Sequence, residues 1–214
     1  MRRFSLGEEN QAGWARFAGS IWYFVLVCGV MAWALGWPGH LAAQPEPGLK
    51  WNQPPAPAQP ADVFYGWNEP SMLGQVIAAD DWVCTTTNPI TALRWWGSFP
   101  NWPAPLPVQP PDVFQLAIWT DVPAGVDKPY SHPGVVIWHS FCTDFTWRQV
   151  GWDFDPRRNR YEACYEFTCV LPAEQWFYQP GQPGQTNILW ISIAALYNQP
   201  TEFLWGWKTR PRSA

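Results

Sequence analysis

Apolar and polar residues alternate along most of the chain after residue 61, in short runs that proline or glycine separates. Residues 112–121 show the pattern most clearly, because Phe114, Leu116 and Ile118 would share one face of an extended chain. A period of two residues indicates half-buried β-strands. The same pattern predicts further strands at residues 63–67, 75–83, 90–97, 134–141, 145–154, 160–170, 186–197 and 203–208.

The stretch at residues 75–99, QVIAADDWVCTTTNPITALRWWGSF, shows how we expect these strands to be connected. Its two strands flank a polar turn at residues 85–89 and are expected to pair. The turn sequence at residues 155–159 likewise predicts a hairpin between the strands on either side of it. Only residues 172–178 favour a helical turn. We therefore predict an all-β domain, an antiparallel β-sandwich of jelly-roll or immunoglobulin-like type.

The composition supports this fold class and excludes one class of function. The chain has 24 prolines, 18 tryptophans and only 14% charged residues, so long helices are disfavoured while aromatic side chains supply a core. The net charge is −4. Nucleic-acid binding needs a basic surface, so we expect no nucleic-acid partner.

The first 43 residues have the pattern of an export signal. Arg2, Arg3 and Arg16 precede an uncharged run at residues 21–37, which we expect to form a hydrophobic helix, and small residues follow up to Ala43. Either this segment is a signal peptide cleaved after Ala43, or it is an uncleaved membrane anchor. In both cases the rest of the chain is secreted or held on the exported side of the cell envelope. Any membrane contact would be made through this segment.

A proline-rich linker and one domain are expected after the signal. Residues 44–60 contain six prolines and predict an extended spacer. The β-sandwich domain then spans residues 61–214.

Four cysteines follow Ala43, and an even number outside the cell favours structural disulfides. Cys164 and Cys169 lie on one predicted strand, about 16 Å apart if it is extended, so they cannot bridge each other. Two patterns remain. We prefer Cys84–Cys164 with Cys142–Cys169, because the predicted hairpin brings Cys142 towards Cys169; the converse pairing stays open.

Several phrases of the sequence resemble an uncharacterised family of extracellular bacterial β-sandwich domains. They are ADDWVC at residues 79–84, WWGS at 95–98, IWTDVPA at 118–124, WISIAA at 190–195 and GWKTRP at 206–211. The resemblance covers about residues 51–212. It implies a fold and an extracellular location, but no assigned activity.

The sequence offers little for catalysis. Asp80 and Asp81 are adjacent on one strand, so their side chains point to opposite faces and cannot act as a pair. Asp153, Asp155 and Asn159 bracket a turn and could collect oxygen ligands for a structural Ca²⁺, although ordinary turn chemistry is the alternative. We expect no enzyme activity and no other cofactor.

The excess of aromatic residues gives the functional hypothesis. Trp96, Trp119 and Trp102 could form an exposed platform that stacks on sugar rings, and their burial in the domain is the alternative. The first hypothesis is an exported, non-catalytic module that binds a glycan or another cell-surface polymer. The second is a structural or adhesive surface domain without a small ligand, whose partner would be a cell-surface protein.

The end of the sequence predicts an exposed sheet edge. Phe203, Trp205 and Trp207 form one apolar strand face, while Lys208 and Arg210 carry charges that discourage pairing with another chain. We expect this strand to lie at an edge and to promote self-association when both charges are removed.

Overall fold

The computed structural model describes residues 5–7, 48–102, 108–181 and 186–210. Within these residues the chain is mostly β, with one short 3₁₀-helix, η1 (Ala173–Gln175), and no α-helix. The all-β class predicted from the sequence is confirmed. None of the described helices has the length and apolar character to span a membrane. The predicted export segment and its helix at residues 21–37 lie outside the described residues.

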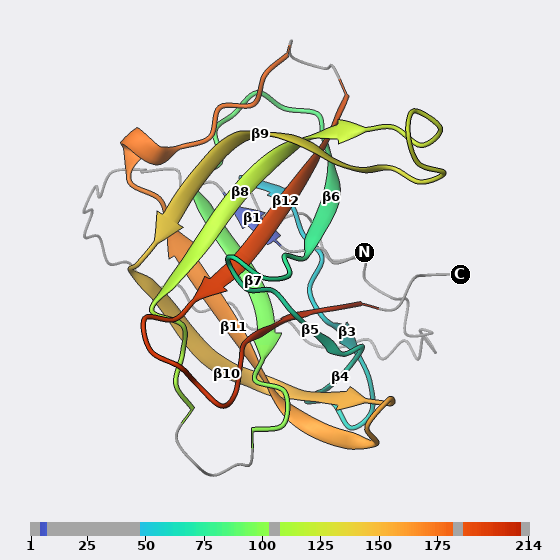
Figure 1. The fold of residues 1–214 in the computed structure, drawn as a ribbon, viewed down its shortest axis with the longest axis vertical. Helices are drawn as coiled ribbons and strands as arrows, with labels where there is room; N and C mark the ends of the chain where they lie inside the picture. Colours follow the sequence, from blue (N-terminus) through green and yellow to red (C-terminus); the bar gives the residue numbers. More distant parts are fainter. Residues whose placement is uncertain (1–4, 8–47, 103–107, 182–185, 211–214) are drawn as a thin grey trace, which may run out of the picture. The chain divides into compact units, whose positions relative to one another are not determined.

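The described strands form two sheets (Figure 1). Sheet B is antiparallel and has the strand order β6–β12–β8–β9. Its strands are β6 (Ala79–Cys84), β8 (Val113–Val122), β9 (His132–Cys142) and β12 (Asn187–Leu196).

Sheet A is larger and follows the order β2–β1–β7–β11–β10–β4–β3, with β13 paired to both β7 and β5. It is mixed, because β4 runs parallel to β10. Its strands are β1 (Ser5–Gly7), β2 (Leu49–Trp51), β3 (Ala56–Pro57), β4 (Val63–Tyr65), β5 (Asn68–Pro70), β7 (Ala92–Ser98), β10 (Phe145–Asp155), β11 (Arg160–Val170) and β13 (Gly206–Lys208).

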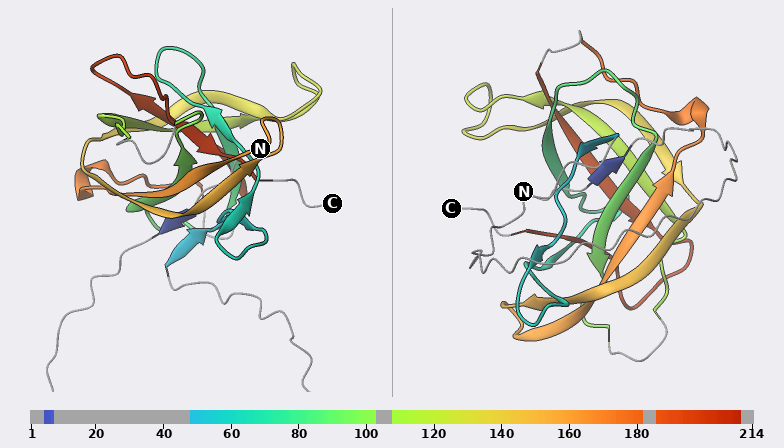
Figure 2. Two further views of the ribbon diagram at one scale, coloured as in Figure 1. Left: turned by 90° about the horizontal axis from the view of Figure 1, so that it is seen from below. Right: turned by 180° about the vertical axis from the view of Figure 1, so that it is seen from behind.

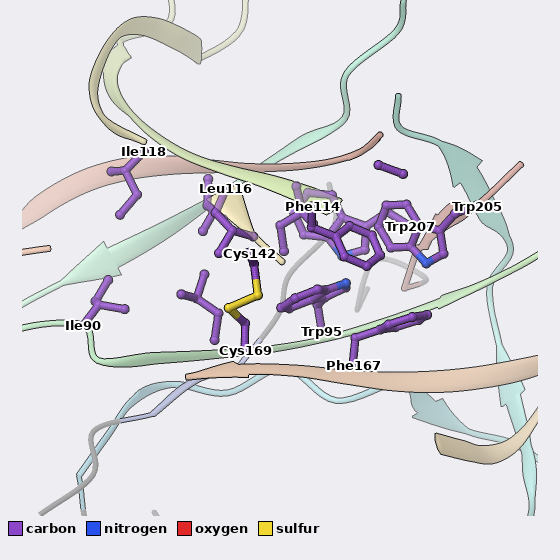
Figure 3. Packing of buried hydrophobic residues seen from close by; sticks show 14 of the residues in the cluster. Ile90, Trp95, Phe114, Leu116, Ile118, Cys142, Phe167, Cys169, Trp205 and Trp207 are labelled. Carbon is purple, nitrogen blue, oxygen red and sulfur yellow. A yellow bond between two sulfur atoms is a disulfide. The ribbon is translucent and has the colours of Figure 1, made fainter. Parts of the chain in front are cut away.

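The main core lies between the sheets and is largely aromatic (Figure 3). Phe114 of sheet B packs edge-on against Trp95 of sheet A, with ring centroids 5.0 Å apart, and against Trp205 at 4.9 Å. Trp95 stacks on Phe167 at 5.9 Å. Edge-to-face and offset pairs of this kind add to the free energy gained by burying the rings. The alternation predicted for residues 112–121 therefore places Phe114 in the core, as the pattern requires.

The disulfide Cys142–Cys169 connects the sheets, since Cys142 ends β9 and Cys169 lies in β11. This half of the preferred pattern is present. Cys84 and Cys164 are free and buried, so the predicted Cys84–Cys164 bridge is wrong. The reason is the direction of the two side chains: Cys84 belongs to the core cluster between the sheets, whereas Cys164 is not part of that cluster and lies next to Asp153.

Residues 75–99 do not form the predicted paired strands. β6 enters sheet B beside β12, whereas β7 enters sheet A between β11 and the strands β1 and β13. The connection therefore crosses from one sheet to the other. The predicted hairpin across residues 155–159 is present as β10 and β11.

From residue 48 onward, the proline-rich segment is part of sheet A and is not a linker. It contains β2 and β3. Pro55, which lies between these strands, and Ala58, which follows β3, are both buried. The domain boundary predicted at residue 61 is therefore too late. Residues 44–47 lie outside the described residues.

The strand at the end of the chain is not an edge. β13 has β7 on one side and β5 on the other, and Trp205 and Trp207 are fully buried. The predicted self-association on removal of Lys208 and Arg210 loses its basis, because β5 already covers β13.

Candidate functional site

One end of sheet A closes into a ring of paired strands. Around the ring β10 pairs with β11, β11 with β7, β7 with β13, and β13 with β5. Only Gly66 and Trp67 separate β5 from β4, and β4 pairs with β10. In the rear view the β10–β11 hairpin curls towards β4 (Figure 2, right). Side chains on the inner face of this ring therefore have strands on several sides.

Three polar residues from three strands of this ring are connected through one carboxylate, that of Asp153. Lys208 of β13 places Nζ 2.7 Å from Oδ1 of Asp153 of β10. Asn68 of β5 donates from Nδ2 to Oδ2 of the same carboxylate at 2.9 Å. All three are buried, with exposed fractions of 4%, 0% and 2% for Lys208, Asp153 and Asn68. We name these three residues the Lys208 cluster.

Some polar atoms of the cluster have no hydrogen-bond partner. Among the described residues, Lys208 Nζ and Asp153 Oδ1 have only this ion pair and no further hydrogen-bond partner. The Asn68 carbonyl oxygen Oδ1 is also buried without a hydrogen-bond partner. Buried polar atoms are nearly always hydrogen-bonded in folded proteins, so an exception is a feature to explain.

Burial changes the proton affinity of the groups in the ring. Removal from water raises the pKa of the Asp153 carboxyl above its ordinary value, although Lys208 and Asn68 act in the opposite direction. Burial, followed by the negative charge of Asp153, raises the pKa of the neighbouring Cys164 thiol well above its usual range. Cys164 is therefore a neutral thiol beside the cluster and not a reactive thiolate.

Glycines let the strands of the ring approach closely. A Cβ atom on Gly66 would lie 2.4 Å from the backbone oxygen of Thr209, and Gly66 has a φ of +99°. A Cβ atom on Gly206 would lie 2.9 Å from Cβ of Asn68. The absence of a side chain at Gly66 and Gly206 lets β5 and β13 lie close together. Asn68 is then directly opposite Lys208 in the ladder.

Both sides of the cluster are covered by other side chains. Lys208 and Trp96 line a cavity of only about 10 Å³ together with Gln53, Pro54 and Pro55 of the proline-rich segment. Near Asn68, Arg157 donates to its backbone oxygen at 3.5 Å and stacks over the Trp67 ring at 4.8 Å. Bulk water therefore has little access to the Lys208 cluster.

The three tryptophans expected to form a platform lie elsewhere and apart. Trp96 is buried and lines the small cavity beside Lys208. Trp119 of β8 is half-buried, and its indole nitrogen donates to Ser192 Oγ at 2.9 Å. Trp102 is half-buried against the core, with its ring 6.4 Å from that of Tyr165. None of the 14 tryptophans after Ala43 is exposed, and all of them lie in the described residues.

The residues expected to bind Ca²⁺ have cationic partners of their own. Asp153 faces Lys208, and Asp155 accepts from the Arg157 side chain at 3.2 Å. Asn159 has a left-handed backbone with a φ of +49°, as a turn residue. In the part of the chain that the structure describes, no group of three or more His, Cys, Asp or Glu side chains is arranged to hold a metal ion.

Sequence reasoning did not find the Lys208 cluster. It treated Lys208 as an edge charge and Asp153 as a turn ligand, and it did not single out Asn68. One signal was present: in Trp205–Lys208 the two tryptophans alternate with Gly206 and Lys208, so a buried strand must direct Lys208 to the face opposite the core. No feature of the sequence pointed to Asn68.

The comparisons with known proteins give a family without an assigned role. Residues 49–214 match a family described as "Domain of unknown function (DUF7901)". The chain belongs to the DUF7901 family. No curated protein and no solved structure matches it significantly. The DUF7901 match begins at the first residue of β2, so the proline-rich segment is part of the family domain as well as of the fold.

Proposed function

We propose that this DUF7901 chain is an exported, non-catalytic β-sandwich module with a structural role. The observation that carries the proposal is that no tryptophan after Ala43 is exposed and that the Lys208 cluster is buried. Glycan-binding modules need planar rings that are open to solvent. Of the three rings predicted for that purpose, Trp96 is buried and Trp119 and Trp102 are half-buried.

A role outside the cell is supported by the disulfide between the sheets and by the signal-like N-terminal sequence. Disulfides persist in oxidising compartments and are rare in the cytosol. The covalent link between β9 and β11 joins the two layers directly. A module with this construction is suited to hold its shape while it supports or spaces other parts of a surface assembly.

The test compares binding with stability. The full chain is applied to glycan arrays and to isolated cell-wall polymers, beside Trp119→Ala. We expect no retained ligand for either protein. Trp119 is the appropriate substitution because it is half-buried and its indole makes one identified hydrogen bond, to Ser192.

The proposal fails if the array retains a glycan that Trp119→Ala loses while its thermal midpoint is unchanged. That result would restore the first functional hypothesis, with Trp119 as a contact residue.

A further inference from the structure

The Lys208 cluster places an amine and a carboxamide against the two oxygens of one carboxylate. Lys208 and Asn68 are directly opposite each other in the antiparallel β5–β13 ladder. Residues opposite each other in such a ladder have their Cβ atoms about 5 Å apart and their side chains on the same face. The carboxylate of Asp153 touches both of their side chains, with one oxygen for each.

We propose that Lys208 and Asn68 become joined by an amide bond between Nζ and the side-chain carbonyl carbon, with Asp153 as the proton carrier. This cross-link would be made by the folded chain itself. The inference goes beyond the structural role proposed above and does not depend on it.

The reaction balances without any added reagent. Asp153 takes a proton from the Lys208 ammonium, and the resulting neutral amine attacks the carbonyl carbon of Asn68. A new C–N bond forms, the bond from that carbon to the Asn68 nitrogen breaks, and the nitrogen leaves as ammonia after receiving a proton through Asp153. The products are one secondary amide and one ammonia, and no atom is oxidised or reduced.

The geometry favours Asn68 over Asp153 as the acceptor. Lys208 Nζ lies against an oxygen of the carboxylate, which is the position for proton transfer. A carboxylate is also a poor electrophile, whereas a carboxamide has a neutral leaving nitrogen once that nitrogen is protonated. The unpaired Oδ1 of Asn68 can accept a hydrogen bond from the protonated Asp153 after rotation of the amide, which would polarise the carbonyl.

The surroundings favour Asp153 as the proton acceptor. Burial disfavours the charged form of a carboxyl group. The raised pKa of Asp153 has this direction. The ring also holds both reacting groups on adjacent strands, which replaces a bimolecular encounter by an intramolecular one.

The experiment is mass spectrometry on the purified full chain after reduction and denaturation. We expect the mass to be lower than the sequence requires by one ammonia. Trypsin cannot cleave after a modified Lys208. The digest should therefore contain one branched species in which residues 51–94, with Asn68, are joined to residues 161–212, with Lys208.

Three variants assign the roles. Lys208→Arg keeps the positive charge but cannot form the amide, and it should restore the full mass. Asp153→Asn keeps the shape but removes the proton carrier, and it should leave the two peptides separate in protein whose circular dichroism is native. Lys128→Arg is the matched control: this exposed lysine lies in the β8–β9 loop, and the branched peptide should persist.

Wild-type protein that is folded yet has the full mass and two separate peptides overturns the proposal, and this measurement does not depend on whether any variant folds. Loss of one water with Lys208 joined to residues 149–157 would also overturn it, because Asp153 would then be the acceptor.

Discussion

Lys208 and Asp153 are charged groups that the fold removes from water, and this is costly for an isolated ion. The desolvation of each ion is several kcal/mol even after relaxation, so a buried pair is seldom a large source of stability. An apolar pair of similar volume would fill the ring at a lower cost. Their presence beside Asn68 is therefore better explained by chemistry between the side chains than by the stability of the ion pair.

Asp155 shows the more ordinary use of a buried carboxylate. Burial acts to raise its pKa, but hydrogen bonds from the Arg157 backbone and side chain, with the charges of Arg157 and Arg158, lower it overall. The side chain is nearly inaccessible to solvent. It binds Arg157, which lies in the turn between β10 and β11.

We predict that Asp155→Asn destabilises the domain at pH 7 by about 1.5–3 kcal/mol, the range for a hydrogen bond to a charged group. Because the folded-state pKa is below the unfolded value of about 3.9, the ionised carboxylate stabilises above that value. This contribution is lost as the pH falls through the folded-state pKa. Urea unfolding at several pH values should show the difference between wild type and variant shrinking below about pH 4.

Asp127→Asn is the control for this measurement. Its pKa is also lowered, by a hydrogen bond from His132, but the carboxyl is exposed and its charge is screened by solvent. A difference for Asp155→Asn that is constant down to pH 2 would contradict the assignment.

At the scale of elements, the alternating pattern located strands well but could not determine their neighbours. The predicted ranges 145–154 and 160–170 agree closely with β10 and β11, and the short turn between them fixed their pairing. β6 and β7 are connected by residues 85–91, a short segment as well, yet they enter different sheets. Strand pairing of this kind is decided by packing across the whole domain.

The residue types of β9 also did not predict which of its side chains are exposed. Val135, Val136 and Ile137 are consecutive β-branched residues, and all three are exposed on this outer strand of sheet B. Core positions elsewhere carry the same residue types. Alternation identifies a strand, but the coverage of its faces depends on segments that are remote in sequence.

The disulfide Cys142–Cys169 connects the two sheets, and we predict that it contributes to the stability of the domain. Cys142 and Cys169 are separated by 27 residues, and closing a loop of that length is expected to stabilise the folded state by about 3.5 kcal/mol. The Cys142→Ala, Cys169→Ala double variant should lose most of this, measured by chemical denaturation.

Cys84→Ala serves as the control, because this buried cysteine is free and the substitution removes only one sulfur atom. Thiol alkylation of unfolded, unreduced protein should label Cys84 and Cys164 and leave Cys142 and Cys169 unmodified. Labelling of all four would show that the bridge does not form.

For the domain as a unit, the proline-rich segment is the part that sequence composition described least accurately. Its prolines favour an extended chain, as predicted, but the extended chain runs across sheet A instead of away from it. Arg210 donates to the Pro54 backbone oxygen at 3.3 Å, and the Ala58 amide donates to the Val63 oxygen at 2.7 Å. Composition gives the local conformation of such a segment, whereas its docking depends on Trp96 and Lys208.

The last prediction concerns the role of this segment in closing the ring. Replacing residues 52–58 by a Gly/Ser sequence of equal length should open the side of the ring that holds Trp96 and Lys208. Flexible residues lose more conformational entropy on docking and bury less apolar surface than proline, so we expect a loss of roughly 2–4 kcal/mol in the free energy of unfolding. Trp96 would then become accessible to a soluble fluorescence quencher. The same replacement at residues 123–129, which are exposed in the β8–β9 loop, should change neither quantity appreciably. Equal effects at the two sites would mean that residues 52–58 act only as a linker, and that the strands alone keep water from the Lys208 cluster.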